Sequence, residues 1–124
     1  MTAKTIMLID DDSVNNFVNK RLLLRHDDSL QIEAYEAGRQ AMADLIEKKN
    51  EHPDLILLDL NMPEMNGWQF LEEYLNQGFD QSKIFLLTSS IDFRDKEKSQ
   101  TFPVIAGFIS KPLDQTKINR ILSN

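Results

Sequence analysis

The stretch PDLILLDLNMPEMNG, from Pro53 to Gly67, contains a short apolar run that ends in a single carboxylate. The run from Leu55 to Leu58 is bounded by Pro53 and Asp59, which is typical of a strand buried on both faces of a parallel sheet. Turn-forming residues follow Asp59 before the next predicted helix. Ligands of open parallel sheets bind beyond the carboxyl ends of the strands. The stretch therefore places an acid where active sites form.

The same pattern recurs elsewhere in the chain, because other short apolar runs also end in polar residues. The run at 5–9 is followed by Asp10, Asp11 and Asp12, the run at 84–87 by Thr88, and the run at 107–110 by Lys111. Residues 29–35 alternate between apolar and polar, which predicts a less buried strand at an edge of the sheet. We therefore expect five strands.

Apolar residues at helical spacing predict five helices between and after these strands. In the first helix, Val14, Phe17, Val18 and Leu22 would face inward, and Leu23 and Leu24 would widen that face near its end. Asp12 or Ser13 would cap the start of this helix. The second would begin near residue 38, with Ile46 among its inward residues. The fourth, DFRDKEKSQ, is mostly charged and has Phe93 as its only clear apolar anchor, so we expect it to be the least stable.

This alternation predicts an α/β fold, a single domain over residues 1–124 with a doubly wound, five-stranded parallel sheet covered by helices on both faces. Right-handed crossovers then bring the carboxyl ends of the strands to one edge. That edge would gather residues far apart in the sequence, namely Asp10, Asp11, Asp59, Thr88 and Lys111.

Composition narrows the classes of function. The 124 residues contain no cysteine, which rules out disulfides and thiolate metal sites. With 20 acidic and 14 basic residues the net charge is −6, which disfavours direct binding to nucleic acid or to an anionic membrane. The start of the sequence lacks the pattern of a signal peptide, and no apolar run has the length of a membrane span. We expect a cytoplasmic protein.

The gathered residues predict phosphoryl-transfer chemistry. Three converging carboxylates repel one another unless a cation neutralises them, and their oxygen ligands favour Mg²⁺. With Lys111 as a further positive charge, Asp59 becomes the candidate nucleophile, and the Thr88 hydroxyl can donate a hydrogen bond to a phosphoryl oxygen. The two histidines, His26 and His52, are predicted on the surface, and no glycine-rich nucleotide loop is present.

Four motifs, IMLIDDD, LILLDLNMPEMNG, FLLTSS and GFISKP, resemble in order and spacing the receiver domain of two-component response regulators. The resemblance spans essentially the whole chain. It implies a flavodoxin-like fold with strand order 2-1-3-4-5. It also implies that Asp59 is the phosphoacceptor, that Asp10 and Asp11 hold Mg²⁺ together with Asp59, and that Asn61 offers its backbone carbonyl to the metal.

The same resemblance assigns roles to other residues. Thr88 matches the switch hydroxyl, Lys111 the lysine that pairs with the phosphoryl group, and Phe108 the aromatic residue whose rotamer follows phosphorylation. The bond between Lys111 and Pro112 is a candidate cis peptide. Asn61 and Ser90 match positions that tune the rate of dephosphorylation.

The resemblance also implies partners. The phosphoryl group would come from a histidine kinase or a histidine phosphotransfer protein, and an unidentified downstream protein would read the face made by the fourth helix, the fifth strand and the fifth helix. The apolar connection at 102–105 would either pack under the fourth helix or contribute to that docking face. Because the sequence ends just after the fifth predicted helix, we expect no output domain. A phosphorylation-dependent homodimer is a further option.

Three rival functions are open to test. A phosphatase of the haloacid dehalogenase type also uses a nucleophilic aspartate and Mg²⁺, but it needs an acid two residues later, where this chain has Asn61. A flavodoxin would present hydroxyls and amides in its first loop instead of three aspartates. A receiver that acts only as a scaffold would not need the complete set of acids, hydroxyl and lysine found here.

Overall fold

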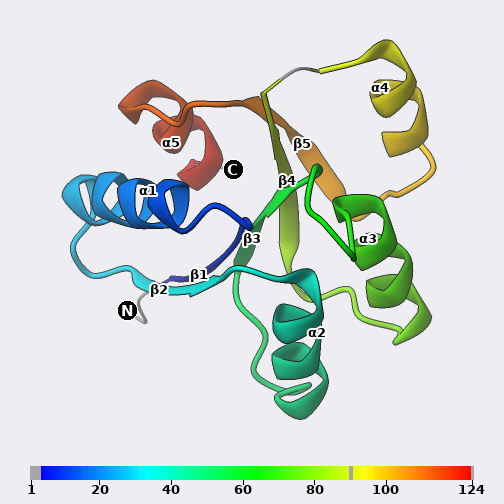
Figure 1. Cartoon of the computed structure of the whole chain (residues 1–124). Coiled ribbons are helices and arrows are strands. Elements are labelled where there is room, and N and C mark those ends of the chain that lie inside the picture. The colour runs from blue at the N-terminus through cyan, green and yellow to red at the C-terminus, as the bar shows by residue number, and fades with distance from the viewer. Residues whose placement is uncertain (1–3, 90, 124) are drawn as a thin grey trace.

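The computed structural model describes residues 4–89 and 91–123, and strands and helices alternate along this part of the chain (Figure 1). The strands are β1 (Thr5–Ile9), β2 (Gln31–Tyr35), β3 (Leu55–Asp59), β4 (Lys83–Thr88) and β5 (Ile105–Ser110). The helices are α1 (Ser13–His26), α2 (Gly38–Glu47), α3 (Gly67–Asn76), α4 (Phe93–Ser99) and α5 (Gln115–Leu122).

All five strands are parallel and lie in the order β2-β1-β3-β4-β5, so the predicted fold class and strand order are confirmed. Strand β2 forms one edge of the sheet, as its weak burial indicated. Helices α1 and α5 cover one face, whereas α2, α3 and α4 lie on the other (Figure 1). The carboxyl ends of the strands consequently share one edge, between the two helical layers.

The central strand β3 explains why the core has two halves. All five of its residues are buried, and successive side chains point to opposite faces. Ile56 and Leu58 belong to the apolar cluster that α2 and α3 cover. Leu55 and Leu57 belong to the cluster that α1 and α5 cover. The continuous apolar run before Asp59 is therefore required by burial on both sides of the sheet.

The orientation predicted for the first half of helix α1 is wrong, whereas Leu22, Leu23 and Leu24 pack toward the core as expected. Val14 and Phe17 are 65% and 60% exposed, and the buried positions are Asn16, Asn19 and Leu23. Hydrogen bonds set this orientation. Nδ2 of Asn16 donates to the backbone carbonyl oxygen of Asp10, just after β1, at 3.0 Å, and to that of Tyr35, at the end of β2, at 3.2 Å. Satisfying these carbonyl groups outweighs the burial of a few apolar side chains that sequence periodicity favoured.

Helix α4 has no buried residue, which agrees with its expected weakness, but Phe93 does not anchor it and is 72% exposed. One contact of α4 with the body is made by Lys98, whose Nζ lies 5.1 Å from the ring centroid of Trp68. Trp68 in turn packs on Phe102, with ring centroids 5.7 Å apart. Phe102 is buried, which confirms the packing interpretation for at least this residue of the 102–105 connection.

Smaller differences concern the ends and faces of elements. In α2, Ile46 is exposed and not inward as expected. Strand β5 begins at Ile105, two residues before the predicted start. The cis bond expected between Lys111 and Pro112 is present, and Gly78 ends helix α3 with a φ of 76°, a conformation that glycine adopts readily.

Candidate functional site

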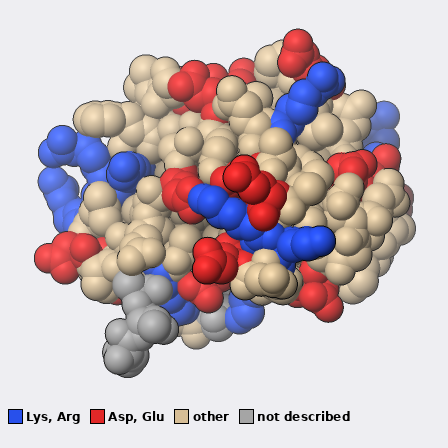
Figure 2. All heavy atoms as spheres, turned by 90° about the horizontal axis from the view of Figure 1, so that it is seen from below, with Lys and Arg blue, Asp and Glu red and all other residues tan. Residues whose placement is uncertain are grey.

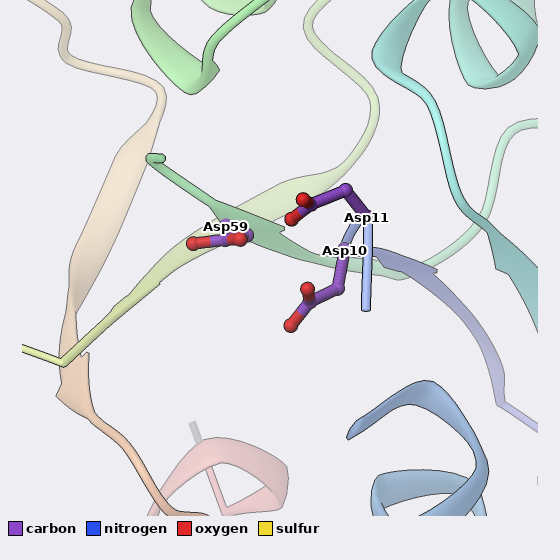
Figure 3. Close-up of side chains that lie close together, drawn as sticks. All are labelled: Asp10, Asp11 and Asp59. Atoms are coloured by element: carbon purple, nitrogen blue, oxygen red, sulfur yellow. The ribbon is translucent and has the colours of Figure 1, made fainter. Parts of the chain in front are cut away.

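Three carboxylates meet at the carboxyl ends of β1 and β3 (Figure 3). Asp10 and Asp11 directly follow β1, and Asp59 is the last residue of β3, its neighbour in the sheet. One oxygen atom from each carboxylate lies within 4.8 Å of the other two. Asp10 and Asp59 are buried, and Asp11 is exposed, so the cluster has a protected base and an open side.

A lysine that follows the edge strand β5 neutralises part of the charge of the three carboxylates. Lys111 follows β5, and its Nζ lies 3.0 Å from Oδ2 of Asp10 and 3.4 Å from Oδ1 of Asp59. Its backbone N–H donates to the carbonyl oxygen of Thr88 at 2.8 Å, which fixes the lysine to the end of β4. Although burial acts to lower the pKa of Lys111, the hydrogen bond and charge of Asp10, together with Asp59, raise it overall, so the side chain is a cation.

Asp59 is an unusual carboxyl group. Its burial, and secondarily the nearby charge of Asp10, raise its pKa to about 6, although the N–H of Asn61 and the ammonium of Lys111 act in the opposite direction. Burial dominates because a charged carboxylate loses water when it leaves the surface. A carboxyl group poised in this way at a cluster of acids is typical of a functional site.

Backbone groups hold the carboxylates in place. The N–H of Asn61 donates to Oδ1 of Asp59 at 3.2 Å, and the N–H of Asp12 donates to Oδ1 of Asp10 at 2.9 Å. Asp12 also caps α1 through its side chain, as one of the two predicted caps. Asp10 and Asp59 are therefore each tied to the turn that follows.

Gly67 is a supporting residue that the sequence did not single out beyond its turn chemistry. A Cβ built on it would lie 2.9 Å from the backbone oxygen of Asp59 and 2.9 Å from Cα of Leu60, closer than real Cβ contacts. Helix α3 can therefore begin directly against the strand that carries the phosphoacceptor candidate only because residue 67 lacks a side chain. Nothing in the turn signal alone indicates this contact.

The remaining predicted residues lie at different distances from the carboxylates. Thr88 is fully buried at the end of β4, and Asn61 is exposed beside Asp59. Phe108 is half-buried in β5, in register with Leu86, and packs on the cluster under α2 and α3 instead of on the acids. Ser90 lies outside the described residues. The structure therefore gathers the acids, the lysine and the end of β4, and leaves Phe108 in the adjoining core.

The surface agrees with an acidic chain. On the face drawn in Figure 2, acidic and basic side chains are interspersed, and no broad area is basic alone. None of the helices in the described ranges has the length and apolar character that a membrane crossing requires.

The chain resembles known proteins over nearly its whole length. The family model described as the response regulator receiver domain matches residues 6–123. A two-component response regulator from Cytophaga hutchinsonii has a TM-score of 0.88 and 29% identity, covering 99% of this chain and 96% of that one. One from Legionella pneumophila has a TM-score of 0.86 and 31% identity, covering 97% and 95%.

Curated relatives include two-component response regulator 24 of Arabidopsis thaliana, which is 30% identical over 118 residues, 95% of this chain and 81% of that protein. Other relatives are much longer. The chain spans 18% of another Arabidopsis regulator and 7% of the hybrid signal transduction histidine kinase L of Dictyostelium discoideum, to which it is 21% identical.

Proposed function

Because this chain belongs to the response regulator receiver family, we propose that it is a phosphorylation-dependent signalling switch in which Asp59 accepts the phosphoryl group. The observation that carries the proposal is that the Asp59 carboxylate has an oxygen within 4.8 Å of oxygens of Asp10 and Asp11, and lies 3.4 Å from the ammonium of Lys111. In this proposal residues 1–124 act as one domain, which changes state without turning over a separate substrate.

The donor set of the acidic cluster fits a hard divalent cation. Three carboxylates offer oxygen ligands only, and Mg²⁺ characteristically takes one or two carboxylates while keeping water ligands. Asp10, Asp11 and Asp59 would hold it, with the backbone carbonyl of Asn61 as a further ligand. When bound, Mg²⁺ would neutralise charge on the carboxylates and on the phosphoryl oxygens.

The transfer itself is a displacement at phosphorus. An oxygen of the Asp59 carboxylate forms a bond to the phosphorus of a phosphohistidine, the phosphorus–nitrogen bond breaks, and the imidazole leaves with that electron pair and takes a proton from solvent. Lys111 moves its hydrogen bonds to a phosphoryl oxygen, and the Thr88 hydroxyl donates to another. Attack of water on phosphorus later releases phosphate and regenerates Asp59.

Phosphorylation would act by stabilising one of two states of the fold. Thr88 and Phe108 lie in neighbouring strands, and in the proposed second state Thr88 would shift toward the phosphoryl group while Phe108 turns. The α4–β5–α5 face would then present a different surface to a downstream protein. The weak attachment of α4 supports this choice, since an element with no buried residue moves at low cost.

The proposed phosphoryl donor is a histidine kinase or a histidine phosphotransfer protein. A relative described as a hybrid histidine kinase matches over 94% of this chain, which supports a common donor chemistry. The donor's identity, the downstream protein and any phosphorylation-dependent homodimer lie beyond this proposal.

Intact-mass spectrometry after incubation with acetyl phosphate and Mg²⁺ tests the proposal. The parent should gain the mass of one phosphoryl group, and Asp59→Asn or a chelator should abolish the gain. Asp80→Asn is a matched control, because it removes one exposed acid away from the cluster and should behave as the parent. If neither acetyl phosphate nor a phosphorylated histidine kinase modified the parent, the switch would be excluded and the scaffold function would remain.

A further inference from the structure

Lys117, in the first turn of α5, makes two hydrogen bonds outside the acidic cluster. Its Nζ donates to the backbone carbonyl oxygen of Ser110 at 2.8 Å and to that of Pro112 at 2.9 Å. These two residues come directly before and after Lys111, the lysine that contacts the acids. Both distances are typical of hydrogen bonds that a charged ammonium donates. One side chain therefore holds the backbone on both sides of Lys111.

The backbone of Lys117 is itself fixed. Its N–H donates to Oδ1 of Asp114, the N-cap of α5, at 2.8 Å. The next residue, Ile118, is fully buried in the core cluster that α1 and α5 cover. Helix α5 is therefore a firm support, from which the ammonium of Lys117 reaches the two carbonyl groups.

The two bonds leave little freedom to the backbone of Lys111. The peptide unit between Ser110 and Lys111 is planar, and both of its polar groups are bonded. Its carbonyl accepts from Lys117, and its N–H donates to the carbonyl oxygen of Thr88 at 2.8 Å. On the other side, the ring of Pro112 fixes φ, and the carbonyl of Pro112 is held by Lys117. The point from which the side chain of Lys111 extends is therefore set by α5 as well as by β4.

Support from α5 matters because β5 is an edge strand. In the described part of the chain only β4 pairs with it, so one side of β5 has no neighbouring strand. The ends of such elements open more easily than the central strands of a sheet. Lys111 nevertheless keeps its Nζ 3.4 Å from Oδ1 of Asp59, across the end of β4. The reach of Lys111 therefore depends on how firmly the end of β5 is held.

We propose that Lys117 is a positioning residue, which holds the backbone around Lys111 and so keeps the ammonium of Lys111 within reach of the phosphoryl group on Asp59. This role rests on the proposed phosphorylation of Asp59. Lys117 makes no ion pair with the acids in the described part of the chain and acts through Lys111. When Lys111 moves its hydrogen bonds to a phosphoryl oxygen, its backbone stays in place and only its side chain turns.

Amide hydrogen exchange of the full, unphosphorylated chain tests the support directly, because the N–H of Lys111 exchanges only when its bond to Thr88 opens. In Lys117→Met this N–H should exchange at least about tenfold faster than in the parent, whereas the N–H of Leu57, in the central strand β3, should keep its rate. Lys117→Arg retains donors and should restore slow exchange. Lys20→Met, which removes an exposed lysine of α1, is the matched control and should behave as the parent.

The rate of phosphorylation by acetyl phosphate at saturating Mg²⁺ tests the consequence for the acidic cluster. Lys117→Met should gain the phosphoryl mass at least about threefold more slowly than the parent, because a misplaced Lys111 stabilises the transferred group less well. Lys117→Arg should react nearly as the parent does. The difference between Lys117→Met and the parent should persist from about 0.1 M to about 1 M salt, because screening would remove an effect that acted only through the lost charge.

Each measurement can overturn the role of Lys117. Slow exchange of the Lys111 N–H in Lys117→Met would do so, as would an equal loss of protection at Leu57, which would indicate a general loss of stability. Equal rates of phosphorylation in the parent and Lys117→Met would also exclude it. If the parent itself gained no phosphoryl group from acetyl phosphate or from a phosphorylated histidine kinase, the switch would be wrong, and the exchange rates would still decide whether Lys117 holds the backbone around Lys111.

Discussion

The ammonium nitrogen of Lys111 lies 3.4 Å from Oδ1 of Asp59, although strand β4 separates the strands that carry the two residues. The lysine reaches across the carboxyl end of β4, to which its own backbone N–H is bonded. Together with the 3.0 Å contact to Asp10, this contact joins the two sides of the candidate site. It also opposes the rise in pKa that burial causes at Asp59.

Lys111→Met should therefore raise the pKa of Asp59 further above about 6, because an opposing positive charge is lost. Carbon-detected NMR of the Asp59 carboxyl group, without divalent ions, measures this. Lys111→Arg keeps a cation and should show a smaller change. A pKa that fell in Lys111→Met would contradict the assigned role of the lysine.

The raised pKa of Asp59 also predicts a pH dependence of stability. The folded pKa is about 6 against an ordinary value of 3.8, so the folded state holds this proton more tightly than the unfolded chain does. The favourable contribution is complete below about pH 4 and is lost as pH rises through about 6. Asp59→Asn cannot ionise, so it should not lose this stability as the pH rises.

Chemical denaturation with a chelator present should show that Asp59→Asn is more stable than the parent by about 1–2 kcal/mol at about pH 7.5, less than the full shift implies because the site is partly open to solvent. The difference should nearly vanish at about pH 4. Asp80→Asn, at an exposed position, should lack this pH dependence. Equal stabilisation by Asp59→Asn at both pH values would disagree with the raised pKa.

Mg²⁺ should stabilise the fold through the acidic cluster. At ten times its dissociation constant, a ligand that binds only the folded state adds about 1.4 kcal/mol to the free energy of unfolding. Thermal unfolding at constant ionic strength should show this rise for the parent and a much smaller one for Asp10→Asn. A rise of the same size in both proteins would place the ion elsewhere.

Gly67→Ala should destabilise the chain by about 2–3 kcal/mol, because the new Cβ would clash with the backbone of Asp59 and Leu60. Urea unfolding measures the loss. Gly38→Ala is the matched control, since its Cβ would meet the flexible side chain of Met65 at 3.3 Å and that side chain can move aside. If both variants lost the same stability, the close approach of α3 to β3 would not be the cause.

At two neighbouring positions in α1, replacing the polar residue should destabilise the fold more than replacing the apolar one. Asn16→Ala removes two hydrogen bonds to backbone carbonyl groups, one buried and one partly buried, and should cost about 2–3 kcal/mol. Phe17→Ala removes a side chain that is mostly in solvent and contacts Arg21, so it should cost less than about 1 kcal/mol. Denaturation of both variants under one set of conditions tests the order, and a larger loss for Phe17→Ala would favour the orientation that periodicity predicted.

The sequence predicts the sheet well, because a strand buried on both faces needs a continuous apolar run. The runs before Asp10, Asp59 and Thr88 could belong to few other structures, and the rule for parallel strands places the polar residues at one edge. The meeting of Asp10, Asp11 and Asp59 followed from that rule together with the strand order that the family resemblance implied.

The face of α1 could not be predicted in the same way. Val14, Phe17 and Val18 have helical spacing, but the helix is turned by the hydrogen bonds of Asn16, and periodicity contains no information about which carbonyl groups need a donor. Gly67 shows a similar limit, since a close approach between backbones depends on tertiary structure. Both cases concern contacts that local sequence patterns do not encode.

Through the ion pairs of Lys111, the pairing of the edge strand β5 affects the stability of the carboxylates at the central strands β1 and β3. Asp10 and Asp59 are neighbours whenever β1 and β3 are paired, whereas their lysine is present only while β5 is paired with β4. Fraying of β5 would therefore leave two buried carboxylates without their cation, in addition to breaking strand hydrogen bonds. This penalty discourages forms in which β5 has opened, so β1, β3, β4 and β5 should melt as one cooperative unit.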